Sequence, residues 1–272
     1  MYPSIAVGIL VFSTWRLLAL AAMAVCGLLI LRRAAGLGYP LLPLLVLGGF
    51  EIVVGVSGAR LYDVALPLLL HTAPESGLAS TGGLLAMLAF GLIYIRVVLK
   101  LPPLEVADGT AFALPLFMAI ARIGCALNGC CFGRVVTGGV HSPLTRLLTL
   151  PVRAFSPATP AGAAFRHLAP DTLVWNLPLM FSVNALVALL VVEVVYRHRR
   201  RWHLPAGVVL ATAFASEGCG RFLLEFLRQD EHVGGSAFNP WQLGVAVVSA
   251  LACLFIVVRL RQVSVRYAPL AA

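Results

Sequence analysis

The chain has 272 residues, of which 60% are hydrophobic and only 11% are charged. This composition excludes a soluble globular domain, because such domains carry about 25% charged residues and could not bury so much apolar surface. Long apolar runs separated by short charged clusters are typical of helices that cross a lipid bilayer. The net charge is +9, but the basic residues lie at the ends of apolar runs and in loops. Their placement favours a lipid bilayer with anionic headgroups, and not nucleic acid, as the partner.

Seven transmembrane helices are predicted from the apolar runs, each near the ~20 residues that cross about 30 Å of hydrocarbon. They cover residues 7–31, 40–58, 77–95, 109–127, 173–196, 205–227 and 239–258. The first run lacks the basic start of a signal peptide, so we expect it to be a retained helix. The fold class predicted is an all-α polytopic membrane protein, with residues 1–272 as a single transmembrane domain.

Four connections between these helices hold more than half of the Lys and Arg residues. They contain Arg32 and Arg33, Arg96 and Lys100, the arginines of residues 197–201, and those of residues 259–266. On a seven-helix path all four fall on one side of the membrane, which the positive-inside rule makes cytoplasmic. We therefore expect the amino terminus outside the cell membrane and the carboxyl terminus in the cytoplasm.

The longest connection, residues 128–172, is extracytoplasmic on this topology and is rich in Pro, Gly, Ser and Thr. Its basic side chains are Arg134, His141, Arg146, Arg153, Arg166 and His167. A loop of this length inside a compact protein is usually functional or disordered. We expect an arm or lid, and the alternative is a solvated loop attracted to anionic lipid.

Ionisable residues inside the predicted helices cost at least ~2.5 kcal/mol each, so they are expected to face the bundle interior or a wet cavity. They are Arg16, Glu51, Arg122, Glu217, Arg221 and Glu225. The last three are four residues apart, which on a helix places a guanidinium between two carboxylates. This stripe belongs either to a functional site or to an ion ladder that joins two helices. Arg16 and Glu51 are expected to pair with each other or to face a cleft.

Arg122 lies in a glycine-rich block, residues 121–134, that reads Ala-Arg-Ile-Gly-Cys-Ala-Leu-Asn-Gly-Cys-Cys-Phe-Gly-Arg. Close backbone approach is permitted by its glycines, Gly124, Gly129 and Gly133. Asn128 can donate or accept a hydrogen bond at a bend. We expect Arg122 and Arg221 to meet near the outer surface of the membrane that the helices cross. Such a pair suits a phosphate ester, because arginine binds phosphate oxygens bidentately and stays charged at any relevant pH.

Three cysteines cluster at Cys125, Cys130 and Cys131. A metal or thiol-redox site is one interpretation. The spacing lacks two C-x-x-C pairs and no histidine lies at ligand distance in the sequence, so no metal site is predicted and these thiols are expected to be small apolar fillers. Convergence with Cys219 in space would restore the metal interpretation.

Two blocks carry a family resemblance. Residues 121–134 resemble the glycine-arginine-isoleucine-glycine block, with its asparagine-glycine turn, of the prolipoprotein diacylglyceryl transferase family, with Ala121 in place of the first glycine. Residues 218–228, Gly-Cys-Gly-Arg-Phe-Leu-Leu-Glu-Phe-Leu-Arg, are similar to that family's glycine-arginine-phenylalanine block. Shorter matches extend the resemblance over nearly the whole chain: Gly58-Ala59-Arg60-Leu61, Gly82-Gly83-Leu84, Asp108 and Gln242-Leu243.

The resemblance implies an enzyme of the bacterial inner membrane that takes part in lipoprotein biosynthesis. It would transfer a diacylglyceryl group from phosphatidylglycerol to the lipobox cysteine thiol of a preprolipoprotein, release glycerol phosphate and need no cofactor. Arg122 and Arg221 would hold the phosphate and stabilise charge that develops on the leaving group. Glu225, with Glu217 behind it, would orient Arg221.

The resemblance also implies which residues bind the substrates. Asn128, Gly129 and Gly133 would shape the cleft near the headgroup, and Arg60 is a second-rank candidate for contacting it. Thr81 stands where some relatives carry a histidine proposed to help deprotonate the acceptor thiol, and threonine is a poor base at neutral pH.

Two departures from the family pattern leave alternatives open. The thiol base could be supplied elsewhere, by His141 or His232, because Thr81 cannot do it. The fifth-helix motif is replaced by Leu177-Pro178-Leu179-Met180-Phe181-Ser182. The alternatives are transfer to a different acceptor, or a non-catalytic protein that binds or moves an anionic lipid with the same arginines.

Overall fold

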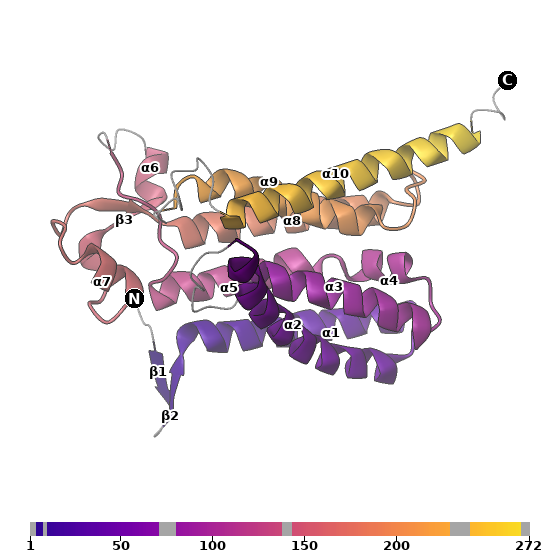
Figure 1. Cartoon of the computed structure of the whole chain (residues 1–272), viewed down its shortest axis with the longest axis horizontal. Coiled ribbons are helices and arrows are strands. Elements are labelled where there is room, and N and C mark those ends of the chain that lie inside the picture. The colour runs from indigo at the N-terminus through magenta and orange to yellow at the C-terminus, as the bar shows by residue number, and fades with distance from the viewer. Residues whose placement is uncertain (1–3, 8–9, 71–79, 138–142, 229–239, 268–272) are drawn as a thin grey trace.

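The structure, a computed structural model, describes residues 4–7, 10–70, 80–137, 143–228 and 240–267. Long helices form the body of the molecule, and a group of short elements lies at one end of it (Figure 1). The long helices are α1 (Thr14–Gly36), α2 (Leu41–Leu70), α3 (Ser80–Val97), α5 (Ala113–Asn128), α8 (Leu177–His198), α9 (Val208–Glu225) and α10 (Pro240–Tyr267). A short helix, α4 (Pro103–Thr110), leads directly into α5.

Five helices in the described part of the chain are long and apolar enough to cross a membrane. They are α1, most of α2 (Leu41–Ala65), α4 together with α5 (Pro103–Asn128), α8, and the Gln242–Gln262 part of α10. The apolar part of α3, Gly82–Val97, is shorter, and α9 carries three ionisable residues. The protein is therefore a polytopic helical membrane protein, whereas the predicted count of seven spans stays a prediction.

The amino terminus differs from the prediction of a helix that starts at residue 7. Strands β1 (Ser4–Val7) and β2 (Leu10–Ser13) pair in antiparallel register instead, and α1 begins only at Thr14. The two strands are four residues long and contain Ile, Val, Leu and Phe. Such β-branched and aromatic residues also favour strands, so the apolar run alone could not place the start of the helix.

Two helices also continue beyond their predicted ends. Helix α2 reaches Leu70 instead of residue 58, and α10 reaches Tyr267 instead of residue 258. The predicted limits followed the apolar runs and stopped before Arg60 and Arg259. Arginine favours helix and its long side chain can extend to water, so the backbone stays helical past the apolar part.

Helices α1 and α9 pack on the pair formed by α5 and α8. Contacts join α1 to α5, α5 to α8, α8 to α9, and α9 to α10, and α2 packs on α3. Glycines allow α2 and α3 to approach closely, because a Cβ on Gly82 would lie 2.8 Å from the Gly58 carbonyl oxygen and one on Gly83 would lie 2.8 Å from the Gly55 carbonyl oxygen. The Gly82-Gly83 pair therefore has a packing role in this fold.

One end of the bundle holds the basic helix ends. The Nη2 atom of Arg33, in the last turn of α1, lies 3.0 Å from Glu193 Oε2 of α8, and the guanidinium lies over the rings of Phe112 and Tyr196. In α10, Arg259 donates to the Ala206 carbonyl oxygen at 3.1 Å. The carboxyl ends of α1, α8 and α10 thus lie at the same end of the molecule (Figure 1).

Asp108 of α4 caps the amino terminus of α9 at this same end. Its Oδ2 accepts from the Gly207 N–H at 2.8 Å and its Oδ1 accepts from the Leu210 N–H at 2.8 Å. A buried carboxylate is stable there, because the first N–H groups of a helix lack partners within the helix and carry a partial positive charge. Asp108 therefore fixes α4 to α9.

The connection between α5 and α8 is folded over most of its length. It contains α6 (Pro143–Leu147), β3 (Thr149–Pro151), a 3-10 turn η1 (Val152–Ala154), α7 (Pro160–Phe165) and β4 (Leu173–Trp175). Strands β3 and β4 pair in antiparallel register. Three buried aromatic rings form a small core beneath them: Phe132, Phe155 and Phe165. In the described residues this segment is a compact cap on one end of the bundle.

Candidate active site

Gly129 ends α5 and starts the turn into the cap. Its φ of +69° lies in the left-handed region that favours glycine, and a Cβ there would meet Thr159 Cβ at 2.6 Å. The Gly129 carbonyl oxygen accepts from the Ala161 N–H at 2.9 Å, which docks α7 on the end of α5. Asn128, the last residue of α5, accepts from the Ser13 hydroxyl at 3.3 Å. Asn128 and Gly129 therefore fix the end of α5 to the residue before α1 and to α7 of the cap.

Gly133 brings the cap against the carboxyl end of α9. Its N–H donates to the Trp175 carbonyl oxygen at 3.0 Å, and the next N–H, of Arg134, donates to the Leu227 carbonyl oxygen at 2.8 Å. A Cβ on Gly133 would lie 2.7 Å from that Leu227 oxygen and 2.8 Å from Trp175 Cβ. The two sequence blocks that carry the family resemblance are thus joined by a backbone hydrogen bond, from Arg134 to Leu227.

Arg122 of α5 and Arg221 of α9 lie beside the same aromatic ring. The guanidinium carbon of Arg122 is 4.7 Å from the Phe181 ring centroid, and that of Arg221 is 5.9 Å from it. Phe181 is only 2% exposed and presents an electron-rich face to the cations. The two guanidinium groups also repel each other. The structure therefore brings together two positive charges that the sequence placed on separate helices, about 100 residues apart.

Arg221 reaches this position with an unsatisfied donor. Its Nε atom is buried and has no hydrogen-bond partner among the described residues. Glu217 and Glu225 attract its charge, while Arg122 and Arg228 oppose it. A buried guanidinium with a free donor is unfavourable unless an anion completes it, which is the arrangement expected of an anion-binding site.

Glu225 binds a different arginine from the one predicted. Its Oε1 accepts from Arg228 Nη1 at 2.8 Å, whereas Arg221 is attracted to it without a direct ion pair within 4 Å in the described structure. Glu225 is buried and its Oε2 has no partner among the described residues. Helix α9 ends at Glu225, and the two residues after it form a turn. This turn brings Arg228, three residues after Glu225, back to the Glu225 carboxylate.

Other predicted residues are exposed, half-buried or outside the described structure. Arg60 is exposed on α2, and the side chain of Thr81 is not among those described. His141 and His232 lie outside the described residues. Glu217 is half-buried on α9, where its carbonyl oxygen accepts from Asn184 Nδ2 at 3.0 Å.

The predicted pairing of Arg16 with Glu51 is not found among the described residues, and the alternative, that they face a cleft, stays a prediction. Arg16 is exposed in the first turn of α1. The Oε1 of Glu51 points at the glycine face of α3, where a Cβ on Gly91 would lie 2.6 Å from it. Among the described residues no ion pair joins the two side chains: Arg16 lies in the first turn of α1, and Glu51 lies inside the first half of α2.

Phe181 is the contributor to this site that sequence reasoning missed. It falls in the segment where the fifth-helix motif of the family is replaced, and a single phenylalanine within an apolar run carries no pattern of its own. The glutamine of the Gln242-Leu243 match is also at this end: it is 3% exposed and its Nε2 donates to the Phe222 carbonyl oxygen at 3.3 Å.

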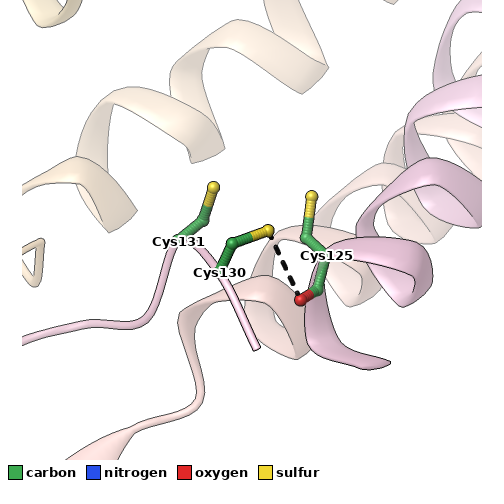
Figure 2. A group of neighbouring side chains, drawn as sticks. All are labelled: Cys125, Cys130 and Cys131. Atoms are coloured by element: carbon green, nitrogen blue, oxygen red, sulfur yellow. Dashed lines mark hydrogen bonds between the residues drawn. The ribbon is translucent and has the colours of Figure 1, made fainter. Parts of the chain in front are cut away.

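Three thiols gather at the end of α5 (Figure 2). The sulfur atoms of Cys125, Cys130 and Cys131 all lie within 4.8 Å of one another, although the sequence spacing disfavoured such a group. Hydrogen bonds from Cys125 and Cys130, together with the positive charges of Arg122 and Arg228, lower the pKa of the Cys131 thiol. Hydrogen bonds with the other two thiols and burial raise the pKa of Cys130. Cys219 lies beside Cys253 and not in this group.

This combination defines a class of protein: a helical membrane protein in which two arginines of separate helices lie beside one buried ring. The family model for prolipoprotein diacylglyceryl transferase matches residues 4–261. The chain belongs to the prolipoprotein diacylglyceryl transferase family, and it is a transferase.

Similar proteins in three bacteria support this assignment, and each is named phosphatidylglycerol–prolipoprotein diacylglyceryl transferase. The protein of Geobacter sulfurreducens is 30% identical over 210 residues, which cover 72% of this chain and 69% of the relative. That of Symbiobacterium thermophilum is 30% identical over 220 residues, 78% of this chain and 75% of the relative. That of Paenarthrobacter aurescens is 27% identical over 226 residues, which cover 78% of this chain and 67% of the relative.

Proposed function

We propose that this protein transfers the diacylglyceryl group of phosphatidylglycerol to the lipobox cysteine of a preprolipoprotein, in the cytoplasmic membrane of a bacterium. The family assignment and the names of the relatives support this activity. The observation that carries it in this chain is the pair Arg122 and Arg221 on Phe181, with the unsatisfied Nε of Arg221. The donor lipid offers a phosphate diester for that pair.

The proposed topology has seven spans, an outer amino terminus and a cytoplasmic carboxyl terminus. The basic ends of α1, α8 and α10 support it, because they lie together and cytoplasmic loops carry an excess of Lys and Arg. The cap and the arginine pair would then lie at the outer surface. This is the side on which a lipobox thiol becomes accessible after its precursor is exported.

The proposed reaction is a displacement at the glyceryl carbon that carries the phosphate. The thiol loses its proton, the sulfur forms a C–S bond, the C–O bond breaks, and the glycerol phosphate oxygen takes the electron pair. Arg122 and Arg221 bind the phosphate and stabilise the charge that grows on that oxygen. Because Arg221 is desolvated, its attraction to this charge is stronger than it would be in water.

The remaining candidate residues support this pair. Glu225 positions the end of α9 through Arg228, and Glu217 adds negative charge beside Arg221. Asn128, Gly129 and Gly133 hold the end of α5 against the cap, which fixes the direction from which a headgroup enters. Arg60 is proposed to contact the headgroup and Thr81 to lie in the cleft.

The test is a transfer assay with the purified protein, phosphatidylglycerol vesicles and a lipobox peptide, with lipid and peptide masses measured together. We expect release of glycerol phosphate, and we expect Arg122→Lys and Arg221→Lys each to lower turnover by about 10²–10³-fold, since lysine loses bidentate phosphate binding. Arg259→Lys, at the other end of the bundle, is the matched control and should keep the wild-type rate.

Two results would overturn the proposal. Wild-type turnover in both site variants would remove the arginines from the mechanism. Protein that binds phosphatidylglycerol but modifies no lipobox peptide would favour another acceptor or a lipid-binding role without transfer.

A further inference from the structure

The cysteine group has the composition and spacing of a metal site. Each of the three thiols offers one sulfur ligand, and all three sulfur atoms lie within 4.8 Å of one another. Zinc binds thiolates at about 2.3 Å in a tetrahedral arrangement, which requires neighbouring sulfur atoms about 3.8 Å apart. Each pair would have to close by about 1 Å or less, a distance that small side-chain rotations can provide.

The backbone is shaped to bring these thiols together. Cys125 lies on the last turn of α5, and the left-handed Gly129 reverses the chain after it. The Cys130 N–H donates to the Cys125 carbonyl oxygen at 3.1 Å. Cys131 then adopts a φ of +61°, which is uncommon for a residue with a side chain. Two left-handed residues within three positions turn Cys130 and Cys131 back toward Cys125 (Figure 2).

Three sulfur ligands without an oxygen or nitrogen ligand favour zinc or a similarly thiophilic ion over magnesium or calcium. Structural zinc sites have four protein ligands, whereas catalytic ones keep three and leave one position open. Cys130 and Cys131 are half-buried, so the open position can be reached from outside the bundle. The site also carries a net negative charge when the three thiolates hold Zn²⁺, which the nearby Arg122 and Arg228 complement.

The group also lies where an acceptor thiol is needed. Cys125 follows Arg122 by three residues, so both side chains project from the same face of α5. The two sequence features are therefore adjacent: a phosphate-binding arginine and a set of metal ligands. Thr81 gives this chain no base at the position where some family members have histidine, and a thiol that coordinates zinc loses its proton on binding.

We propose that Cys125, Cys130 and Cys131 bind one Zn²⁺ ion through their thiolates, and that the fourth position takes the thiol of the acceptor. The second half rests on the proposed transferase function. The acceptor proton goes to solvent when its sulfur coordinates the metal. The bound thiolate then attacks the glyceryl carbon, the C–S bond forms, and the C–O bond breaks with its electron pair left on the glycerol phosphate.

The first experiment uses Co²⁺ as a spectroscopic probe on the full-length protein in detergent, after chelation and reduction without oxygen. We expect one Co²⁺ per chain, with thiolate-to-cobalt charge-transfer absorption and the intense visible bands of tetrahedral cobalt, and displacement by Zn²⁺. A variant with Cys26, Cys219 and Cys253 all changed to Ser should keep the spectrum. Cys130→Ser and Cys131→Ser should lose it. An absent spectrum, or one that survives both single variants, overturns the site.

A second measurement avoids the variants, which could fold poorly. Alkylation of the wild-type protein, read by peptide mass, should slow at Cys125, Cys130 and Cys131 when Zn²⁺ is added and should not change at Cys219. Equal rates with and without Zn²⁺ overturn the site. A disulfide between two of the three thiols that survives mild reduction also overturns the site.

The third measurement separates the two halves of the proposal. A lipobox peptide should shift the visible cobalt bands, and its Cys→Ser version should not. Metal-free protein should transfer about 100-fold more slowly, which is the rate loss typical when proton-transfer catalysis is removed. Full activity without metal overturns the acceptor role and leaves the transferase function standing. Bound cobalt in a protein that transfers nothing in either form overturns the transferase function and leaves the metal site standing.

Discussion

Gly133→Ala gives the sharpest test of how the cap controls the arginine pair. The added Cβ would lie 2.7 Å from the Leu227 carbonyl oxygen and 2.8 Å from Trp175 Cβ, about 0.6 Å inside ordinary van der Waals contact. The Leu227 oxygen is a backbone atom, and the Trp175 Cβ is bonded directly to the backbone of its own residue, so neither can rotate away. The carboxyl end of α9 must therefore move from the cap, at a cost of about 1–3 kcal/mol of stability.

This movement reaches the site because Leu227 follows Glu225, the last residue of α9, by two residues, and α9 carries Arg221. A misplacement of about 1 Å can cost 100-fold in rate, so a shift of about 0.6 Å should lower turnover by about tenfold. Turnover is measured by glycerol phosphate release, and stability by thermal unfolding in detergent.

Gly27→Ala is the matched control for this variant. A Cβ on Gly27 meets nothing within 4 Å, so that change should leave turnover unaltered and should stabilise α1 slightly, since alanine favours helix by about 1 kcal/mol over glycine. Gly133→Ala with the wild-type melting temperature and the wild-type rate would refute the reasoning, because it would show that the contact can relax without cost.

Two further variants test single contacts. Asp108→Asn should lower the melting temperature, because one backbone N–H at the start of α9 would face an amide N–H₂ group at a cost of about 1–3 kcal/mol. Turnover per folded molecule should stay unchanged. A loss of turnover at full stability would contradict a capping role. Glu225→Gln should reduce kcat/KM by about tenfold, since the ion pair with Arg228 becomes a hydrogen bond to a neutral amide, worth about 1–1.5 kcal/mol less. Steady-state kinetics at varied lipid concentration check this, and the positioning role fails if kcat and KM both keep their wild-type values.

The sequence predicted the helical membrane architecture because hydropathy is a local property of each run. It predicted the meeting of Arg122 and Arg221 because an ionisable residue in an apolar helix must face the interior of the bundle. The start of α1 was wrong by seven residues, because a short apolar run suits a strand as well as a helix and only the pairing of β1 with β2 decides between them.

The cysteine group and Glu225 show where sequence spacing is a poor guide. Cys125 and Cys130 are five residues apart, which would place them on different faces of a helix, but the helix stops at Asn128 and Gly129 reverses the chain. Glu225 has arginines four residues before and three residues after it, and both spacings allow a pair. The closer pair depends on the end of the helix at Glu225, which the sequence does not mark.

The ring of Phe181 has a consequence for the thermodynamics of the whole fold. Two guanidinium groups held beside one buried ring repel each other whenever no anion lies between them, and this repulsion is part of the free energy of the folded state. An anion that binds there is therefore a stabilising ligand, with an effect that grows as the logarithm of its concentration over its dissociation constant. On the proposed function that anion is phosphatidylglycerol, so the lipid composition of the membrane would set the stability of the protein as well as its supply of substrate.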